Sequence, residues 1–425
     1  VCENQRHGDP GAAAVGIEAS EMQFGCSGKS AMGDRTFQKL DRYPLCKMCR
    51  KNGKGCRKAD MSKIAILDTA ISPGRLHCQK FHACNICREE GVGEHLETSH
   101  GTICARILDS FTSGYELYSI QIMKNARSKT EKPMGDIRHL KEGLFLCLEL
   151  GVDIICMSAV SSLLSDSGVL YEITRKLAQK SILVAALDNR RYVTVPTAYP
   201  FVTGVQSDEK NCLHPGELAY DETDLFCAGL YANCDTTLLA ELGCAPSNSF
   251  AVPAAAARMH DWINEGRQVG EELLRLRPYP AREIEEEISF KRGLGLYREL
   301  PLAVLVSAEE NEAYLACRAA MDALHAKYQV QSAALCSMDA GTDVRFRKRG
   351  FAGNWKQEIL FMECCYKADL VFLVVSKEEQ KFAMEQVSAD LKAEICNDHV
   401  RISFENGCQT GRAEDLADMM YQILQ

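Results

Sequence analysis

The chain has 425 residues, enough for two or three domains, and its composition of 46% hydrophobic and 25% charged residues is that of a soluble globular protein. A net charge of −9 argues against a nucleic-acid-binding surface. The nearest candidate for a membrane span, residues 144–160, is interrupted by Glu149 and Asp153. Neither nucleic acid nor membrane is therefore expected among its partners.

The chain is rich in cysteine, with 21 residues of this type. The number is odd and the chain is not small, so a complete disulfide framework fits poorly. Several of the later cysteines lie inside apolar runs, where Cys packs as a small hydrophobic residue. No secretory signal is visible at the start of the sequence, and together these features predict a cytoplasmic location.

The first domain is expected to follow an irregular segment. Residues 1–60 are rich in Gly, Cys and polar residues without a sustained period, and we expect them to be poorly ordered. From 61 to 262, apolar strands alternate with helical patterns, which predicts a parallel sheet with helices on its faces and functional groups at the carboxyl ends of the strands. Strands are predicted at Lys63–Leu67, Tyr115–Met123, Val152–Ser158 and Ile182–Ala186, and helices at Gly101–Phe111, Gly135–Gly151 and Val169–Gln179.

A charged helical linker is expected over 263–299, broken by Pro278 and Pro280, with the acidic run Glu285–Glu287 on a solvated face. Residues 300–425 then predict a second, smaller α/β domain of the Rossmann or flavodoxin type. Its first strand lacks a glycine-rich phosphate loop, so we expect it to bind a protein partner or to dimerise. Strands are predicted at Leu302–Val306, Val330–Leu335 and Leu370–Val375, with helices near 309–327, 355–366, 378–394 and 412–424.

Three polar residues stand at the ends of predicted elements in the first domain. Asp68 ends the first strand, and His100 opens the following helix. Ser249 precedes Pro253 and a run of alanines, which places it at a helix N-terminus. Each residue alone is also consistent with a helix cap or a solvated position. Together they supply the carboxylate, the base and the alcohol that nucleophilic acyl transfer requires.

The local sequences around these residues carry a family resemblance. DTAI at Asp68, HGT at His100 and SFAVP at Ser249 resemble the three motifs of subtilisin-like serine proteases, in the same order. Between them, ILVAALDN ends in Asn189 and resembles the segment that holds the oxyanion asparagine of that family. The resemblance covers about residues 62–262.

The resemblance implies a subtilisin-like parallel sheet flanked by helices and a serine endopeptidase activity on peptides or proteins, without a required cofactor. Ser249 would be the nucleophile, His100 the general base, and Asp68 the residue that orients the imidazole. The amide of Asn189 and the backbone N–H of Ser249 would bind the oxyanion.

The sequence departs from the family pattern close to the nucleophile and to the oxyanion residue. Ser247 and Asn248 replace a Gly-Thr pair, Asp188 replaces the glycine before the oxyanion asparagine, and Ser99 replaces the glycine before the histidine motif. Two details, HGTIC at His100 and the polar residue Asp188 before Asn189, resemble a divergent intracellular type of subtilase associated with peptide maturation.

The family's Ser-Leu-Gly substrate-binding strand corresponds to Ser158, Ala159 and Val160. Because the glycine is lost, we expect a restricted peptide or precursor substrate. The alternative is a catalytically weak or inactive peptide-binding or scaffold protein that keeps the subtilase fold.

Two CxxC pairs are compatible with a metal site. Cys46 with Cys49, and Cys84 with Cys87, have the ligand type and the local spacing of a structural Cys₄ zinc site. The separation of the pairs is longer than in common zinc ribbons, and the other interpretation is loop thiols that are free or redox-active. Cys104 is predicted to lie on the inward face of the His100 helix as a packed side chain.

Overall fold

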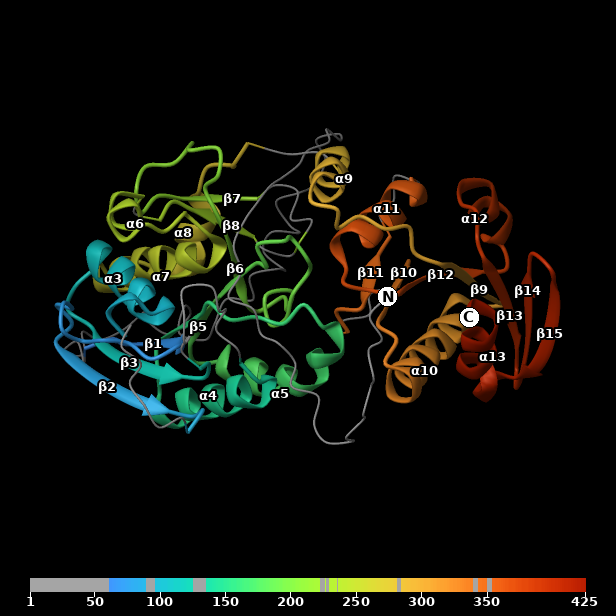
Figure 1. Cartoon of the computed structure of the whole chain (residues 1–425), viewed down its shortest axis with the longest axis horizontal. Coiled ribbons are helices and arrows are strands. Elements are labelled where there is room, and N and C mark those ends of the chain that lie inside the picture. Colours follow the sequence, from blue (N-terminus) through green and yellow to red (C-terminus); the bar gives the residue numbers. More distant parts are fainter. Residues whose placement is uncertain are drawn as a thin grey trace, which may run out of the picture.

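The computed structural model describes residues 61–88, 96–124, 135–221, 226, 229–234, 236–280, 284–338, 343–349 and 354–425. The segment 1–60, expected to be poorly ordered, lies outside these residues. The described residues form two mostly parallel sheets flanked by helices, which confirms the predicted α/β class (Figure 1).

The first sheet has eight strands in the order β2-β3-β1-β4-β5-β6-β8-β7. All neighbouring strands are parallel except β7 and β8. The predicted strands are present as β1, β3, β4 and β5, whereas the short or more polar strands β2, β7 and β8 were not predicted. The bounds are β1 Lys63–Asp68, β2 Lys80–Asn85, β3 Glu116–Gln121, β4 Ile154–Met157, β5 Ile182–Ala186, β6 Thr203–Ser207, β7 Leu218–Tyr220 and β8 Leu230–Ala232.

Helices cover both faces of this sheet, because alternate strand residues point to opposite sides. Ile64 and Ile66 pack with the apolar residues of α3 and α7, whereas Ala65 and Leu67 pack with those of α4 and α5. Figure 1 shows α3, α7 and α8 on one side of the sheet and α4 and α5 on the other. The bounds are α3 His100–Phe111, α4 Ile137–Leu150, α5 Ser167–Leu177, α6 Thr236–Leu242, α7 Asn248–Asn264 and α8 Val269–Arg275.

The second sheet has seven strands in the order β11-β10-β12-β9-β13-β14-β15, and β14 runs antiparallel to both of its neighbours. α10 and α13 contribute to the apolar cluster on one face, and α11 contributes to the cluster on the other. The bounds are β9 Leu302–Ser307, α10 Glu310–Tyr328, β10 Ser332–Cys336, β11 Phe346–Lys348, α11 Trp355–Cys365, β12 Leu370–Ser376, α12 Gln380–Gln386, β13 Leu391–Cys396, β14 His399–Phe404, β15 Gly407–Arg412 and α13 Leu416–Leu424. Short 3-10 turns lie at Leu96–Thr98, Leu164–Asp166 and Ala413–Asp415.

The predicted helix 378–394 is wrong in its second half. The helix ends at Gln386, and the strand β13 begins at Leu391. Leu391, Ala393 and Ile395 are buried in alternation with more exposed neighbours, and β13 pairs with both β9 and β14. The strong helix formers in this segment favoured a helix, but the pairing partners on both sides decide for a strand.

The linker region packs against both parts of the molecule. α8 packs on α7, and α9 (Ile284–Gly293) packs on α11. Glu287 on α9 is 0% exposed, so the prediction of a solvated acidic run is wrong at this position, while Glu285 and Glu286 are exposed. One apolar cluster runs from the α4–α5 side of the first sheet to the α11 side of the second. Among the helices of the described ranges, none has the length and apolar character needed to cross a membrane.

Candidate active site

Asp68, His100 and Ser249 meet although 181 residues separate the first from the last. His100 Nδ1 lies 2.8 Å from Asp68 Oδ2, and His100 Nε2 lies 2.8 Å from Ser249 Oγ. An ionised carboxylate only accepts hydrogen bonds, so the proton on Nδ1 is donated to Asp68 and Nε2 is left to accept the proton of Ser249. The three side chains therefore form a continuous path for a proton from alcohol to base, with a carboxylate behind the base.

Asp68 and His100 are positioned by the strand-to-helix geometry of the first sheet. Asp68 is the last residue of β1 and is 0% exposed, and its Oδ1 accepts a hydrogen bond from the backbone N–H of Thr69 at 2.6 Å. His100 is the first residue of α3, and Ser99 before it accepts from the N–H of Thr102 as the helix cap. Ser99 therefore fixes the start of the helix that carries His100.

Ser249 is the second residue of α7, which Ser247 caps. Pro253 lies one turn further and has no N–H, so the carbonyl of Ser249 has no helical donor four residues on. Cys104 Sγ lies 3.8 Å from this carbonyl. The hydroxyl of Ser247 lies 2.9 Å from that of Ser249 and adds a second polar contact to the nucleophile.

Asn248 and Asn189 join the two loops that flank the nucleophile. The backbone N–H of Asn248 donates to Asn189 Oδ1 at 2.8 Å, and Asn248 Oδ1 accepts from the N–H of Ser207 at the end of β6, also at 2.8 Å. Asn189 is 0% exposed. Its Oδ1 is therefore held by the residue that precedes Ser249 at the start of α7, and the oxyanion role of Asn189 stays a prediction.

Ser158, Ala159 and Val160 follow the carboxyl end of β4 and are all at most 3% exposed. The next residue, Ser161, exchanges backbone hydrogen bonds with Val195 at 2.8 and 2.9 Å. The predicted substrate-binding segment is thus tied to the chain that leaves Asn189, and its side chains are packed inside the protein.

Cys104 lies against the triad, as the helix pattern predicted. Its Sγ is 3.7 Å from His100 Nδ1 and 3.5 Å from Ser158 Oγ, and the residue is 0% exposed. Burial raises the pKa of this thiol, which therefore stays protonated beside the imidazole. Together with Asp68 and His100 it forms the one group of ligand-type side chains within 4.8 Å found among the described residues.

The predicted zinc ligands are only partly placed. Cys46 and Cys49 lie outside the described residues. Cys84 and Cys87 are half-buried, lie at and just beyond the end of β2 and form no disulfide within the described residues, and Cys87 Sγ lies 3.6 Å from His139 Nδ1. The Cys₄ hypothesis stays a prediction.

The charge state of His100 depends on two opposing effects. Burial lowers the pKa of His100, but the charge and the hydrogen bond of Asp68, with a contribution from Cys104, raise it more, so that it lies well above its ordinary value of 6.5. A phenyl ring, that of Phe250, stacks on the imidazole at a centroid distance of 4.9 Å. The neutral base therefore forms only when the pH rises above this elevated pKa.

An additional support of the Asn189 loop was not predicted. Arg191 is 2% exposed, and its Nη1 donates to Glu287 Oε1 of α9 at 2.5 Å. The guanidinium also lies 3.7 Å from the ring centroid of Phe290, and the next residue but one, Val193, donates its N–H to the carbonyl of Cys365 in α11 at 2.7 Å. Ninety-six residues separate Arg191 from Glu287, so no local pattern points to this pair.

No protein-family model and no curated protein match the chain. Solved structures with some similarity include the prenylagaramide maturation protease PagA, with 15% identity, a TM-score of 0.32, and coverage of 54% of this chain and 86% of its own. The epidermin leader peptide processing serine protease EpiP from Staphylococcus aureus has 12% identity, a TM-score of 0.34, and coverage of 60% and 77%. The patellamide maturation protease PatA has 18% identity, a TM-score of 0.32, and coverage of 50% and 84%.

Proposed function

We propose that this chain is a subtilisin-like serine endopeptidase that cleaves a restricted peptide or precursor. The observation that carries the proposal is the hydrogen-bonded series Asp68–His100–Ser249, with 2.8 Å at both steps. The order of the three motifs along the sequence is a second, independent support. The three residues were selected on their local sequences, and their hydrogen bonds were not used in that selection.

Each group has a defined task in this mechanism. Ser249 Oγ attacks the peptide carbonyl while its proton passes to His100 Nε2, and the resulting imidazolium is stabilised by Asp68. His100 then gives the proton to the leaving amine, and water hydrolyses the acyl-enzyme by the same route. Asn189 and the N-terminus of α7 favour the negative charge on the tetrahedral oxygen. The reaction consumes only water, so the proposal requires no cofactor.

A narrow substrate range is supported by the packing around the nucleophile. Ser249 is 1% exposed, and the side chains of the segment Ser158–Val160 are buried. The buried side chains of this segment are therefore not available to a substrate, which leaves little room for varied side chains beside the nucleophile. No disulfide joins the cysteines of the described residues, which supports action in a reducing compartment.

Labelling with a fluorophosphonate tests the proposal directly, because the reagent reacts with an activated serine. We expect a stoichiometric adduct on Ser249, located by peptide mass spectrometry, and no adduct in Ser249→Ala. Ser289→Ala is the matched control, since it removes an exposed hydroxyl on α9 and leaves the nucleophile and its contacts unchanged. A fully folded chain without an adduct on Ser249 would instead support the alternative, a peptide-binding scaffold.

A further inference from the structure

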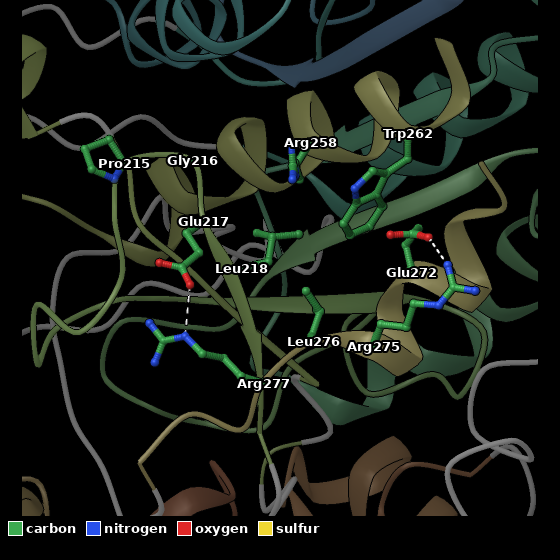
Figure 2. Close-up of a pocket in the computed structure, with 10 residues that line it drawn as sticks. All are labelled: Pro215, Gly216, Glu217, Leu218, Arg258, Trp262, Glu272, Arg275, Leu276 and Arg277. Atoms are coloured by element: carbon green, nitrogen blue, oxygen red, sulfur yellow. Dashed lines mark hydrogen bonds and ion pairs between the residues drawn. The ribbon is translucent and has the colours of Figure 1, made fainter. Parts of the chain in front are cut away.

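A pocket lies at the end of α7 that is remote from Ser249. It has a volume of about 400 Å³ and is formed by α7, by the chain around α8 and by the segment that leads into β7 (Figure 2). Gly216 fixes this segment, since it has φ +74° and an added Cβ would lie 2.9 Å from the ring of Phe111. The pocket is thus built on two helices and a strand, with no part of the triad in it.

Two donors on the same face of α7 line this pocket. Trp262 is 2% exposed, and its Nε1–H has no hydrogen-bond partner within the described ranges. Arg258, one turn earlier, lies over the indole at 5.6 Å from the ring centroid. In Figure 2 both side chains extend from the helix toward the same space. A buried N–H without an acceptor is unfavourable by about 1–3 kcal/mol, so an acceptor group from outside would be stabilised here.

The carboxylates of the pocket are already used. Glu217 accepts from Arg277 Nε at 2.9 Å, and Glu272 accepts from Arg275 and from Arg267 Nη1, the latter at 2.8 Å. Arg258, in contrast, forms no ion pair with any described residue. The ligand therefore has to bring an anionic acceptor and no cation.

An apolar surface lies between the two ion pairs. Leu218 from the start of β7 and Leu276 after α8 occupy this position in Figure 2, opposite Arg258 and Trp262. The ligand that fits this lining carries an acidic group beside an apolar one. A pocket of this volume is large enough for two adjacent side chains, not for a folded domain.

We propose that this pocket is an exosite for the substrate, which binds an acidic side chain and an adjacent apolar side chain of an extended peptide. The substrate role rests on the proposed function, because it assigns the peptide to the protease reaction. Thirteen residues of α7 separate Ser249 from Trp262, or about 20 Å at 1.5 Å per residue. An extended peptide spans about 3.3–3.6 Å per residue, so the anchor lies at least about six residues from the scissile bond.

The test measures binding to the full chain carrying Ser249→Ala, so that no cleavage interferes. The probe is the end-blocked peptide Leu-Glu-Leu-Glu-Leu with a fluorescein label, followed by fluorescence anisotropy. We expect Arg258→Gln to weaken binding by about tenfold or more, because it removes a charge-assisted hydrogen bond. Trp262→Phe keeps the ring and removes only the N–H, and we expect a loss of about threefold or more.

Two controls separate the pocket from general electrostatics. Arg401→Gln removes an exposed positive charge from β14, and we expect it to leave binding of the peptide unchanged. We expect the same peptide with Gln in place of both Glu residues not to bind. Equal binding of the two probes, or binding that is independent of Arg258, would overturn the proposal. Binding of inorganic phosphate with the same Arg258 dependence, without binding of the peptide, would also overturn it.

The two proposals fail in different ways. If Ser249 of the unaltered chain takes the fluorophosphonate label but the acidic peptide does not bind, only the exosite is wrong. If the peptide binds through Arg258 but Ser249 takes no label, the protease assignment and the substrate role are wrong, and the pocket remains a site for acidic peptides.

Discussion

Glu287→Ala removes the carboxylate that pairs with Arg191 between the two sheets. Both side chains are at most 2% exposed, and the two atoms of the pair are 2.5 Å apart. Removing one partner of such a buried pair destabilises a protein by about 3–5 kcal/mol. Here the guanidinium keeps the ring of Phe290 at 3.7 Å and Glu209 at 3.9 Å. We therefore expect the lower end of this range, a loss of about 3 kcal/mol in the free energy of unfolding.

The same substitution is expected to affect catalysis more than substrate binding. Asn189 lies two residues before Arg191, in a turn where the N–H of Arg191 donates to the carbonyl of Asp188 at 2.8 Å. A shift of this turn displaces Asn189, the proposed oxyanion donor, and a misplacement of about 1 Å can reduce the rate about 10²-fold. We expect kcat to fall by about tenfold or more with little change in KM, because the donor acts on the tetrahedral oxygen.

Urea denaturation followed by tryptophan fluorescence measures the stability, and steady-state hydrolysis of a cleaved peptide measures kcat and KM. Glu286→Ala on the exposed side of the same helix is the control and should change neither. The double variant Arg191→Met with Glu287→Leu should regain much of the stability, because an apolar pair leaves no buried charge. A loss below about 1 kcal/mol in Glu287→Ala, or a double variant less stable than the single one, would refute the reasoning.

Three further predictions follow from buried titratable groups. The value of kcat/KM should rise with pH with a midpoint above 6.5, because only neutral His100 accepts the serine proton and its pKa is raised; a midpoint below 6.5 contradicts this. Burial lowers the pKa of His260, which is held neutral against Thr112, so the native state binds fewer protons and stability falls as the pH drops below about 6.5. His260→Gln should therefore make the melting temperature decline less between pH 7 and pH 5, and an equal decline would exclude His260 as the cause. Lys291 is 0% exposed, burial lowers its pKa, and its Nζ has no hydrogen-bond partner among the described residues, so Lys291→Met should leave the melting temperature unchanged or raise it; a drop of several degrees would show that its contact with the Tyr192 ring outweighs desolvation.

The sequence by itself determined the elements whose signals are local. The strands β1, β4 and β5 each contain an unbroken apolar run, and Asp68 and His100 stand where such patterns end or begin. Pro253 and the alanines that follow it marked the start of α7 for the same reason. Parallel strands end at one edge of a sheet, but it was the resemblance to the subtilisin-like motifs that singled out Asp68, His100 and Ser249 as residues that should meet there.

Only the tertiary structure decided the features that depend on distant partners. Asn248, a departure from the family pattern, connects β6 to Asn189, and neither partner is near it in sequence. Glu287 lies in an acidic run whose composition is typical of a solvated helix, yet it is buried because it forms an ion pair with the buried Arg191. The strand β13 has the composition of a helix and exists because β9 and β14 supply hydrogen bonds on both sides. In each case the stabilising contact joins residues that are far apart in the sequence, so no short stretch of the sequence contains both partners.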